Sequence, residues 1–234
     1  MASNSRHLKR TSMPNSWPVK KKNITFVTKP NAGSHKLKYV TPVVVILREV
    51  LGYAQTSKDA KYIVHNKEVL VNGKKVTDVK FAVGMFDIFE LSETKEKFVV
   101  IFDEVGRLKL VPTKDSTITL KVASKTILKS GKFQLNMMNG YNILVDEKTF
   151  KKVSVQDSVV YDFAKKAVKK TLELKEGSQV YLFDGKFKGC FATVKGFTLY
   201  NGLANDLVTL EIEGNEASTA KAYCYVIENT KGFN

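Results

Sequence analysis

The sequence predicts an α+β protein of several domains, because three kinds of pattern follow one another along its 234 residues. A basic segment without acidic residues comes first, apolar residues at helical spacing come next, and alternating apolar and polar residues dominate the remainder. We assign residues 1–40 to an extended basic arm, 41–95 to a helix-and-hairpin domain, 96–170 to a central β-barrel-like domain and 171–234 to a small C-terminal β-barrel. A hydrophobic content of 43% allows the folded parts to bury cores.

The N-terminal arm holds most of the excess positive charge. Residues 1–48 contain ten lysine or arginine residues and no acidic residue, so they supply +10 of the formal net charge of +15. Pro14 and Pro18 prevent a helix in the arm. Such a segment usually binds polyanions, where its cations release counterions and Trp17 can stack on an unpaired base. Two simpler interpretations stay open: a solvated tail for the arm, and packing against the folded domain for Trp17.

Two short helices are expected after the arm. Apolar residues recur at three- and four-residue spacing from Val43 to Ala54, as an amphipathic helix requires. A second helix is expected to be capped by Ser57 and to bury Ala60, Ile63 and Val64. Its open side then carries two lysines.

A tight hairpin follows the helices. Asn72-Gly73 is the strongest short signal for a two-residue turn. Helices and hairpin together resemble the S-four RNA-binding domain, through Thr56, Ser57, Lys58, Lys61, the run Val69 to Lys74, Gly84 and Asp87. The resemblance implies an RNA-facing side formed by Ser57, Lys58, Lys61, Asn72, Lys74 and Lys75. For any single surface lysine, simple solvation is the open alternative.

Alternating apolar residues indicate strands from Phe98 onward. A hairpin is expected over 98–110, and further strands are expected over 118–122, 133–137, 141–145 and 153–163. The lysine-rich residues 164–176 are interpreted as a connection. Short strands without long helices between them favour a small, partly closed β-barrel for the central domain.

The last domain opens with a glycine-rich turn between two strands. Residues 177–194 combine a strand, the turn Gly185 to Gly189 with Lys186 and Lys188, and a returning strand. This pattern resembles the KOW motif of SH3-like barrels, in which glycines bring the backbone close to RNA and the turn lysines reach phosphate. A plain β-hairpin is the open alternative.

The order of these parts resembles one family, the e-type fourth protein of the small ribosomal subunit in archaea and eukaryotes (S4e). The residues that carry the resemblance are His7 to Arg10, Pro14, Ser16, Trp17, Gly33, His35 to Leu37, Val69 to Lys74, Phe133 to Asn136, Gly140 and Gly177 to Val194. Ser34, Phe187 and Cys190 depart from the family pattern, and Asp157 lacks the glycine that often precedes it. The length is of the archaeal type.

The resemblance implies a structural constituent of the small ribosomal subunit in the cytoplasm. It would bind ribosomal RNA and neighbouring ribosomal proteins as a single copy per ribosome, without catalysis, cofactor or small-molecule substrate. RNA-binding side chains are expected at Arg6, His7, Lys9, Arg10, Trp17, Lys20, Lys21, Lys22, His35, Lys36, Lys38, Ser57, Lys58, Lys61, Asn72, Lys74, Lys75, Lys186 and Lys188. The alternatives are a free-standing RNA-binding regulator and an RNA-modifying enzyme, which would need catalytic motifs that the sequence does not show after residue 91.

Cysteine and histidine spacing argues against a metal site. Cys190 and Cys224 are the only cysteines, and no C-x-x-C or H-x-x-x-H spacing occurs. The longest apolar run, Val43 to Leu47, is far shorter than the roughly 20 residues of a membrane span, and the N-terminus lacks the apolar core of a secretion signal. We therefore expect a soluble protein with reduced thiols and without a metal site.

Overall fold

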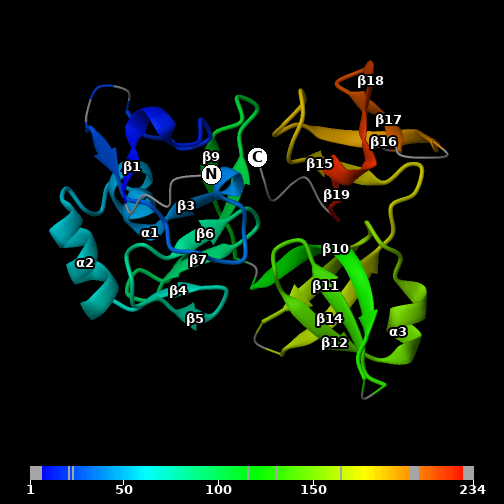
Figure 1. Cartoon of the computed structure of the whole chain (residues 1–234), viewed down its shortest axis with the longest axis horizontal. Helices are drawn as coiled ribbons and strands as arrows, with labels where there is room; N and C mark the ends of the chain where they lie inside the picture. The colour runs from blue at the N-terminus through cyan, green and yellow to red at the C-terminus, as the bar shows by residue number, and fades with distance from the viewer. Residues whose placement is uncertain are drawn as a thin grey trace. The chain divides into compact units, whose positions relative to one another are not determined.

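The structure is a computed structural model that describes residues 7–20, 22, 24–114, 116–129, 131–163, 165–200 and 206–228. The chain divides into two compact units, one formed by residues 1–102 with 106–115 and the other by residues 103–105 with 116–234. Strands dominate both units and the helices are few and short (Figure 1). The expectation of an α+β protein rich in strands is thereby confirmed.

The first unit is built on a five-stranded antiparallel sheet of order β5-β4-β7-β8-β9. Its strands are β4 (Val69–Val71), β5 (Lys74–Lys75), β7 (Ile88–Leu91), β8 (Glu96–Phe102) and β9 (Leu108–Pro112). Two smaller pairs join β1 (Leu8–Lys9) to β2 (Phe26–Val27) and β3 (Val40–Pro42) to β6 (Ala82–Gly84). The helical segments are the 3-10 turns Arg10–Ser12 and Leu37–Tyr39, α1 (Val43–Val45), the π-helical turn Ile46–Val50 and α2 (Ser57–Asn66).

The helical stretch after β3 is shorter than its apolar spacing predicts. Residues 43–47 are all buried, so the apolar character of the segment does mark the core. Helical structure ends at Val50, however, and not at Ala54. Gly52 adopts a φ of +71°, in the left-handed region where helices commonly terminate.

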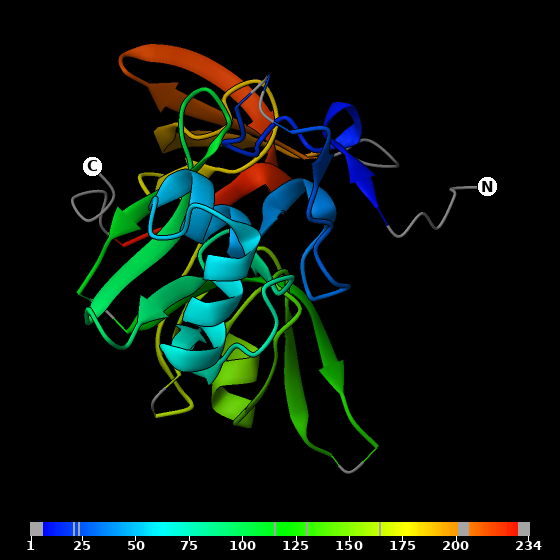
Figure 2. The same cartoon turned by 90° about the vertical axis from the view of Figure 1, so that its left-hand side faces the viewer.

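Helix α2 begins with a capping box. The Thr56 hydroxyl accepts a hydrogen bond from Asp59 N at 3.2 Å, and the Asp59 carboxylate accepts one from Thr56 N at 2.8 Å. The residue that caps this helix is therefore Thr56, and the expectation of a Ser57 cap is wrong by one position. Ala60 and Val64 are buried as expected, whereas Ile63 is half-buried. Figure 1 shows α2 at the outer edge of its unit, and in Figure 2 the same helix, in cyan, is on the side that faces the viewer.

The β4–β5 hairpin has the expected two-residue turn. Asn72 and Gly73 have φ values of 51° and 73°, which is the combination that a type I′ turn needs. The hairpin expected over 98–110 also forms, but in the first unit and not in the central domain. Here β8 pairs with β7, with Ile88 opposite Val99, so this hairpin completes the sheet of the first unit. Alternation marks strands, but it does not tell which sheet they join.

The second unit contains two five-stranded antiparallel sheets. The first has the order β12-β11-β10-β13-β14, formed by β10 (Thr117–Ile127), β11 (Phe133–Met137), β12 (Asn142–Val145), β13 (Ser158–Asp162) and β14 (Ala167–Leu172), with α3 (Glu147–Lys152) after β12. The long central strand β10 pairs with β13 up to Lys121 and with β11 from Val122, and its register with β11 shifts between Val122 and Ser124. Its ribbon with β11 is prominent in Figure 2.

Two segments of this sheet differ from the sequence expectation. The lysine-rich residues interpreted as a connection form the edge strand β14, whose lysines are exposed because an edge strand borders solvent. The strand expected over 153–163 begins only at Ser158, and α3 precedes it.

The second sheet has the order β18-β17-β16-β15-β19. Its strands are β15 (Gln179–Leu182), β16 (Phe191–Thr198), β17 (Leu207–Ile212), β18 (Asn215–Ala220) and β19 (Cys224–Val226), with the 3-10 turn Lys221–Tyr223 before β19. Phe187 packs against the buried cluster of this sheet, so the bulky residue in the glycine-rich turn contributes to the core. Gly185 and Gly189 both have a φ of +90°, which explains the glycines at these positions.

A buried lysine joins the two sheets of the second unit. Lys121 lies on β10, and its ammonium donates hydrogen bonds to the carbonyl oxygens of Lys221, Ala222 and Cys224 at 3.2, 2.7 and 2.6 Å. The Tyr225 hydroxyl adds two bonds, accepting from Lys121 N and donating to Thr119 O. The central and C-terminal sheets are therefore linked by polar contacts as well as by apolar packing.

Candidate nucleic-acid interface

Helix α2 presents two lysines to solvent. Ala60 and Val64 are buried on its inner side, while Lys58 and Lys61 are exposed as expected. The Ser57 hydroxyl is also exposed and lies 3.4 Å from a terminal nitrogen of Arg48. These positions leave both ammonium groups accessible to a polyanion.

The loop after the hairpin adds a further exposed lysine, Lys80. The Asp78 pKa is lowered chiefly because Lys80 N donates to its carboxylate, with further lowering by the Asn31 amide and by the charges of Lys80 and Lys61, against the opposing effect of burial. Lys80 is exposed and was missed from the sequence, where no motif singles it out.

The hairpin exposes its two lysines but not its asparagine. Lys74 and Lys75 are exposed on β5, and Lys75 lies 3.7 Å from Glu68. Asn72 is only 2% exposed. Its amide nitrogen donates to Asp87 at 2.8 Å and its amide oxygen accepts from Ile88 N at 2.8 Å. The expected contact of Asn72 with RNA does not fit this geometry, because the amide is used inside the protein.

Asp87 connects the arm to the hairpin. In addition to the bond from Asn72, the Asp87 carboxylate accepts a hydrogen bond from Gly84 N at 2.8 Å. The same carboxylate lies 3.0 Å from His35 Nε2. A Cβ at Gly84 would overlap the His35 ring, so glycine is required there. His35 is thus an internal partner of Asp87 and its ring is not available on the surface, contrary to its expected contact with RNA.

The arm is folded onto the first unit over its described residues. Ser16 O accepts from Leu108 N at 2.7 Å, the Ser16 hydroxyl donates to Lys38 O at 3.0 Å, and Arg10 N donates to Thr25 O at 3.0 Å. Trp17 is buried at 2% exposure. Trp17 therefore packs against the folded domain, which is one of its two open interpretations. The arm is accordingly neither a free tail nor fully extended.

The remaining basic side chains of the arm border solvent. His7, Lys9, Lys20, Lys22, Lys36 and Lys38 are exposed and Arg10 is half-buried. Arg6 and Lys21 lie outside the described residues. The His7 ring meets the Phe26 ring edge to face at a centroid distance of 5.5 Å, and Phe26 is 54% exposed. Arg107, in the turn before β9, is a further exposed cation that the sequence patterns did not single out.

The glycine-rich turn of the second unit exposes fewer of its expected lysines than α2 and the hairpin do. Lys186 is exposed, with its ammonium 5.6 Å from the centroid of the Phe187 ring, whereas Lys188 is half-buried. Only the first of these two lysines has the open position expected for a phosphate contact.

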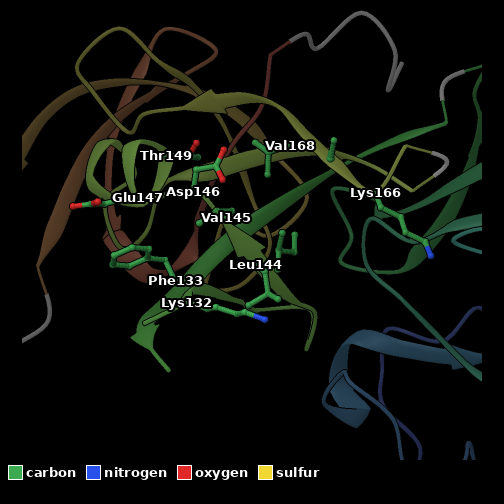
Figure 3. A pocket seen from close by; sticks show the side chains of 11 residues that line it. Lys132, Phe133, Leu144, Val145, Asp146, Glu147, Thr149, Lys166 and Val168 are labelled. Atoms are coloured by element: carbon green, nitrogen blue, oxygen red, sulfur yellow. The ribbon is translucent and has the colours of Figure 1, made fainter. Parts of the chain in front are cut away.

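A hollow of about 540 Å³ lies between β12 and β14 of the central sheet (Figure 3). Lys132 and Lys166 line it together with Asp146 and Glu147. Because both signs of charge share its wall, it lacks the positive character that a phosphate site needs. We leave it out of the candidate interface.

Within the described part of the chain, no three histidine, cysteine or acidic side chains gather in a way that could hold a metal ion. No helix among the described residues is long and apolar enough to cross a bilayer.

Fold and surface together define a class: a basic, strand-rich protein whose exposed lysines suit a nucleic-acid backbone. Residues 3–38 match the RS4NT (NUC023) domain and residues 94–168 match the ribosomal family S4e. The small ribosomal subunit protein eS4 of Methanococcus aeolicus is 33% identical over 236 residues, covering 97% of this chain and 95% of the relative. The corresponding proteins of Halorubrum lacusprofundi and Haloarcula marismortui are each 36% identical, covering 95% and 96% of this chain and 93% and 96% of the relatives.

The chain belongs to the S4e family of ribosomal proteins. Its fold is also similar to the crystal structure of the 30S ribosomal protein S4e from Thermoplasma acidophilum. That comparison has a TM-score of 0.68 at 24% identity and covers 82% of this chain and 97% of the other.

Proposed function

We propose that this chain is a structural constituent of the small ribosomal subunit, where it binds ribosomal RNA and supports subunit assembly and translation. The observation that carries the proposal is its match, over 95% to 97% of its length, to archaeal proteins named small ribosomal subunit protein eS4. Its partners are then small-subunit RNA and neighbouring ribosomal proteins, with one copy per cytoplasmic ribosome. The role is architectural and needs no catalytic group.

The RNA contacts in this proposal are directed at phosphate and shape. Helix α2 and the β4–β5 hairpin form an S-four type module, which supplies Lys58, Lys61, Lys74 and Lys75, and Lys80 adds to it. A cation on a solvent-exposed element can follow an RNA backbone by releasing counterions and by donating to phosphate oxygens. Asn72 and His35 are left out, because Asp87 occupies their side chains.

Two further regions contribute in the same way. The exposed basic side chains of the arm provide a second group of phosphate contacts, and a KOW-type turn in an SH3-like C-terminal barrel provides Lys186. These assignments are supported by exposure and by the excess of positive charge in residues 1–48.

Sedimentation tests the proposal directly. The full chain is added to small subunits prepared without it and centrifuged through sucrose gradients at increasing salt. We expect it to migrate with the small subunit at moderate salt and to leave only at high salt, as phosphate contacts are screened. A chain that stays at the top of the gradient at every salt concentration would instead indicate a regulator acting off the ribosome.

A further inference from the structure

The arm and the turn before β9 enclose a positively charged cavity in the first unit. The cavity has a volume of about 390 Å³, and its cationic wall consists of Arg10, Lys20 and Arg107. None of the described residues that line it is acidic. It therefore has the single-sign charge that the hollow in Figure 3 lacks.

Backbone contacts hold the two sides of this cavity together. The bond from Leu108 N to Ser16 O, at 2.7 Å, fixes the arm beside the residue that follows Arg107. Arg10 is held by its backbone bond to Thr25 O, and its Nε donates to Lys20 O at 3.0 Å. The cavity is thus formed by the folded protein before any ligand arrives, which reduces the entropy lost on binding.

The cationic groups of the wall are available for a ligand. The terminal nitrogens of Arg10, the guanidinium of Arg107 and the ammonium of Lys20 have no acidic partner among the residues that the structure describes. Arginine donates to phosphate oxygens in a bidentate geometry, whereas lysine acts as a point charge. Two guanidinium groups and one ammonium group around one cavity therefore favour a phosphate.

The rest of the wall is mostly apolar, with Asn15 as its polar member. Met13, Pro18 and Val19 line the cavity, and Trp17 closes it. The buried indole nitrogen of Trp17 meets no acceptor in the described parts of the chain, which leaves one donor of the wall unsatisfied. A volume of about 390 Å³ lies at the small end of the range of ligand sites, which is roughly 300–1,000 Å³. The cavity suits a group with one anionic end and one flat, mostly apolar end.

We propose that this cavity binds a single unpaired nucleotide of RNA, with the phosphate on Arg10, Lys20 and Arg107 and the base against the apolar wall. The inference rests on the proposed function, since the cavity would give the ribosomal RNA a specific point of attachment. It also separates the arm's role from that of α2 and the hairpin. The exposed lysines grip a backbone of any sequence, whereas the cavity requires a base that is free to leave its stack.

Trp17 supplies the test, because it is the only tryptophan of the chain and lies in the cavity wall. The full-length protein is titrated with uridine monophosphate, uridine, inorganic phosphate and a short oligouridylate, with indole fluorescence and calorimetry as readouts. We expect the monophosphate and the oligonucleotide to bind, and uridine and inorganic phosphate to bind at least tenfold more weakly. Inorganic phosphate binding as tightly as the monophosphate would overturn the nucleotide assignment.

A matched pair of variants removes one positive charge inside or outside the cavity. Arg107→Gln removes a wall residue, and Lys109→Gln removes an exposed cation two residues away that does not line the cavity. We expect at least a tenfold loss of monophosphate affinity for Arg107→Gln and less than a twofold change for Lys109→Gln. Equal losses would overturn the proposal, because they would reflect general charge.

The two proposals fail in different ways. If the chain migrates with small subunits but binds neither the monophosphate nor the oligonucleotide, the cavity assignment is wrong and the ribosomal role stands. If it binds nucleotides at the cavity but never migrates with small subunits, the proposed function fails and the site remains. Unchanged melting temperatures for both variants are the control for folding, since Arg107 and Lys109 are both exposed.

Discussion

Replacing Lys121 with methionine measures what one buried ammonium group contributes to the second unit. The substitution keeps an unbranched, apolar stem, one atom shorter than that of lysine, and leaves three carbonyl oxygens without their donor. Unsatisfied acceptors of this kind cost about 5 kcal/mol for the three together. Burial, however, lowers the Lys121 pKa to about 8, which corresponds to a penalty of about 3 kcal/mol for the charged form that methionine removes. We expect a net decrease of about 2 kcal/mol in the free energy of unfolding.

Urea denaturation followed by circular dichroism measures this difference, with Lys148→Met on the exposed side of α3 as the control. The folded pKa of about 8 lies below the 10.5 of an unperturbed lysine, so the unfolded chain binds more protons between these values. The stability of the wild type relative to Lys121→Met should therefore rise by about 1 kcal/mol from pH 7 to pH 9. A methionine variant as stable as the wild type, or a difference that is flat with pH, would refute the reasoning.

Three further experiments test the first unit. Thr56→Ala should lower the free energy of unfolding by about 1 kcal/mol through loss of the capping box, whereas Ser57→Ala should change it by less than about 0.5 kcal/mol in the same urea titration. Asp87→Ala should cost about 3 kcal/mol because it leaves buried donors unpaired, and Glu93→Ala, which removes an exposed carboxylate, should cost little. Filter binding to small-subunit RNA should weaken, with a shallower salt dependence and nearly unchanged melting temperature, when alanine replaces Lys58, Lys61, Lys74 and Lys75 together. A large drop in melting temperature would show that these lysines support the core.

Local chemistry made some elements predictable. The turn at Asn72 and Gly73 follows from the backbone angles that these residues tolerate, and helix α2 follows from its cap and spacing. Sheet membership was not predictable in this way, since β8 alternates as it would in either unit and only its pairing with β7 decides. Strand β14 was concealed by its lysines, because an edge strand can expose polar residues that resemble those of a linker.

In the candidate interface, too, local sequence predicts some residues, while the folded structure decides the others. Exposed lysines on α2 and β5 could be predicted, since charged side chains avoid burial. Asn72 and His35 looked like surface polar residues, but both belong to the hydrogen bonds of Asp87, which form only in the folded protein. Arg107 could not be singled out from sequence, because its importance arises from the arm that packs beside it.

The hydrogen bond between His35 and Asp87 joins residues 52 positions apart. During translation at about 5–20 residues per second, His35 therefore precedes its partner by about 3–10 s. Until Asp87 has followed it out of the ribosome, the basic N-terminal segment lacks the carboxylate on which His35 docks.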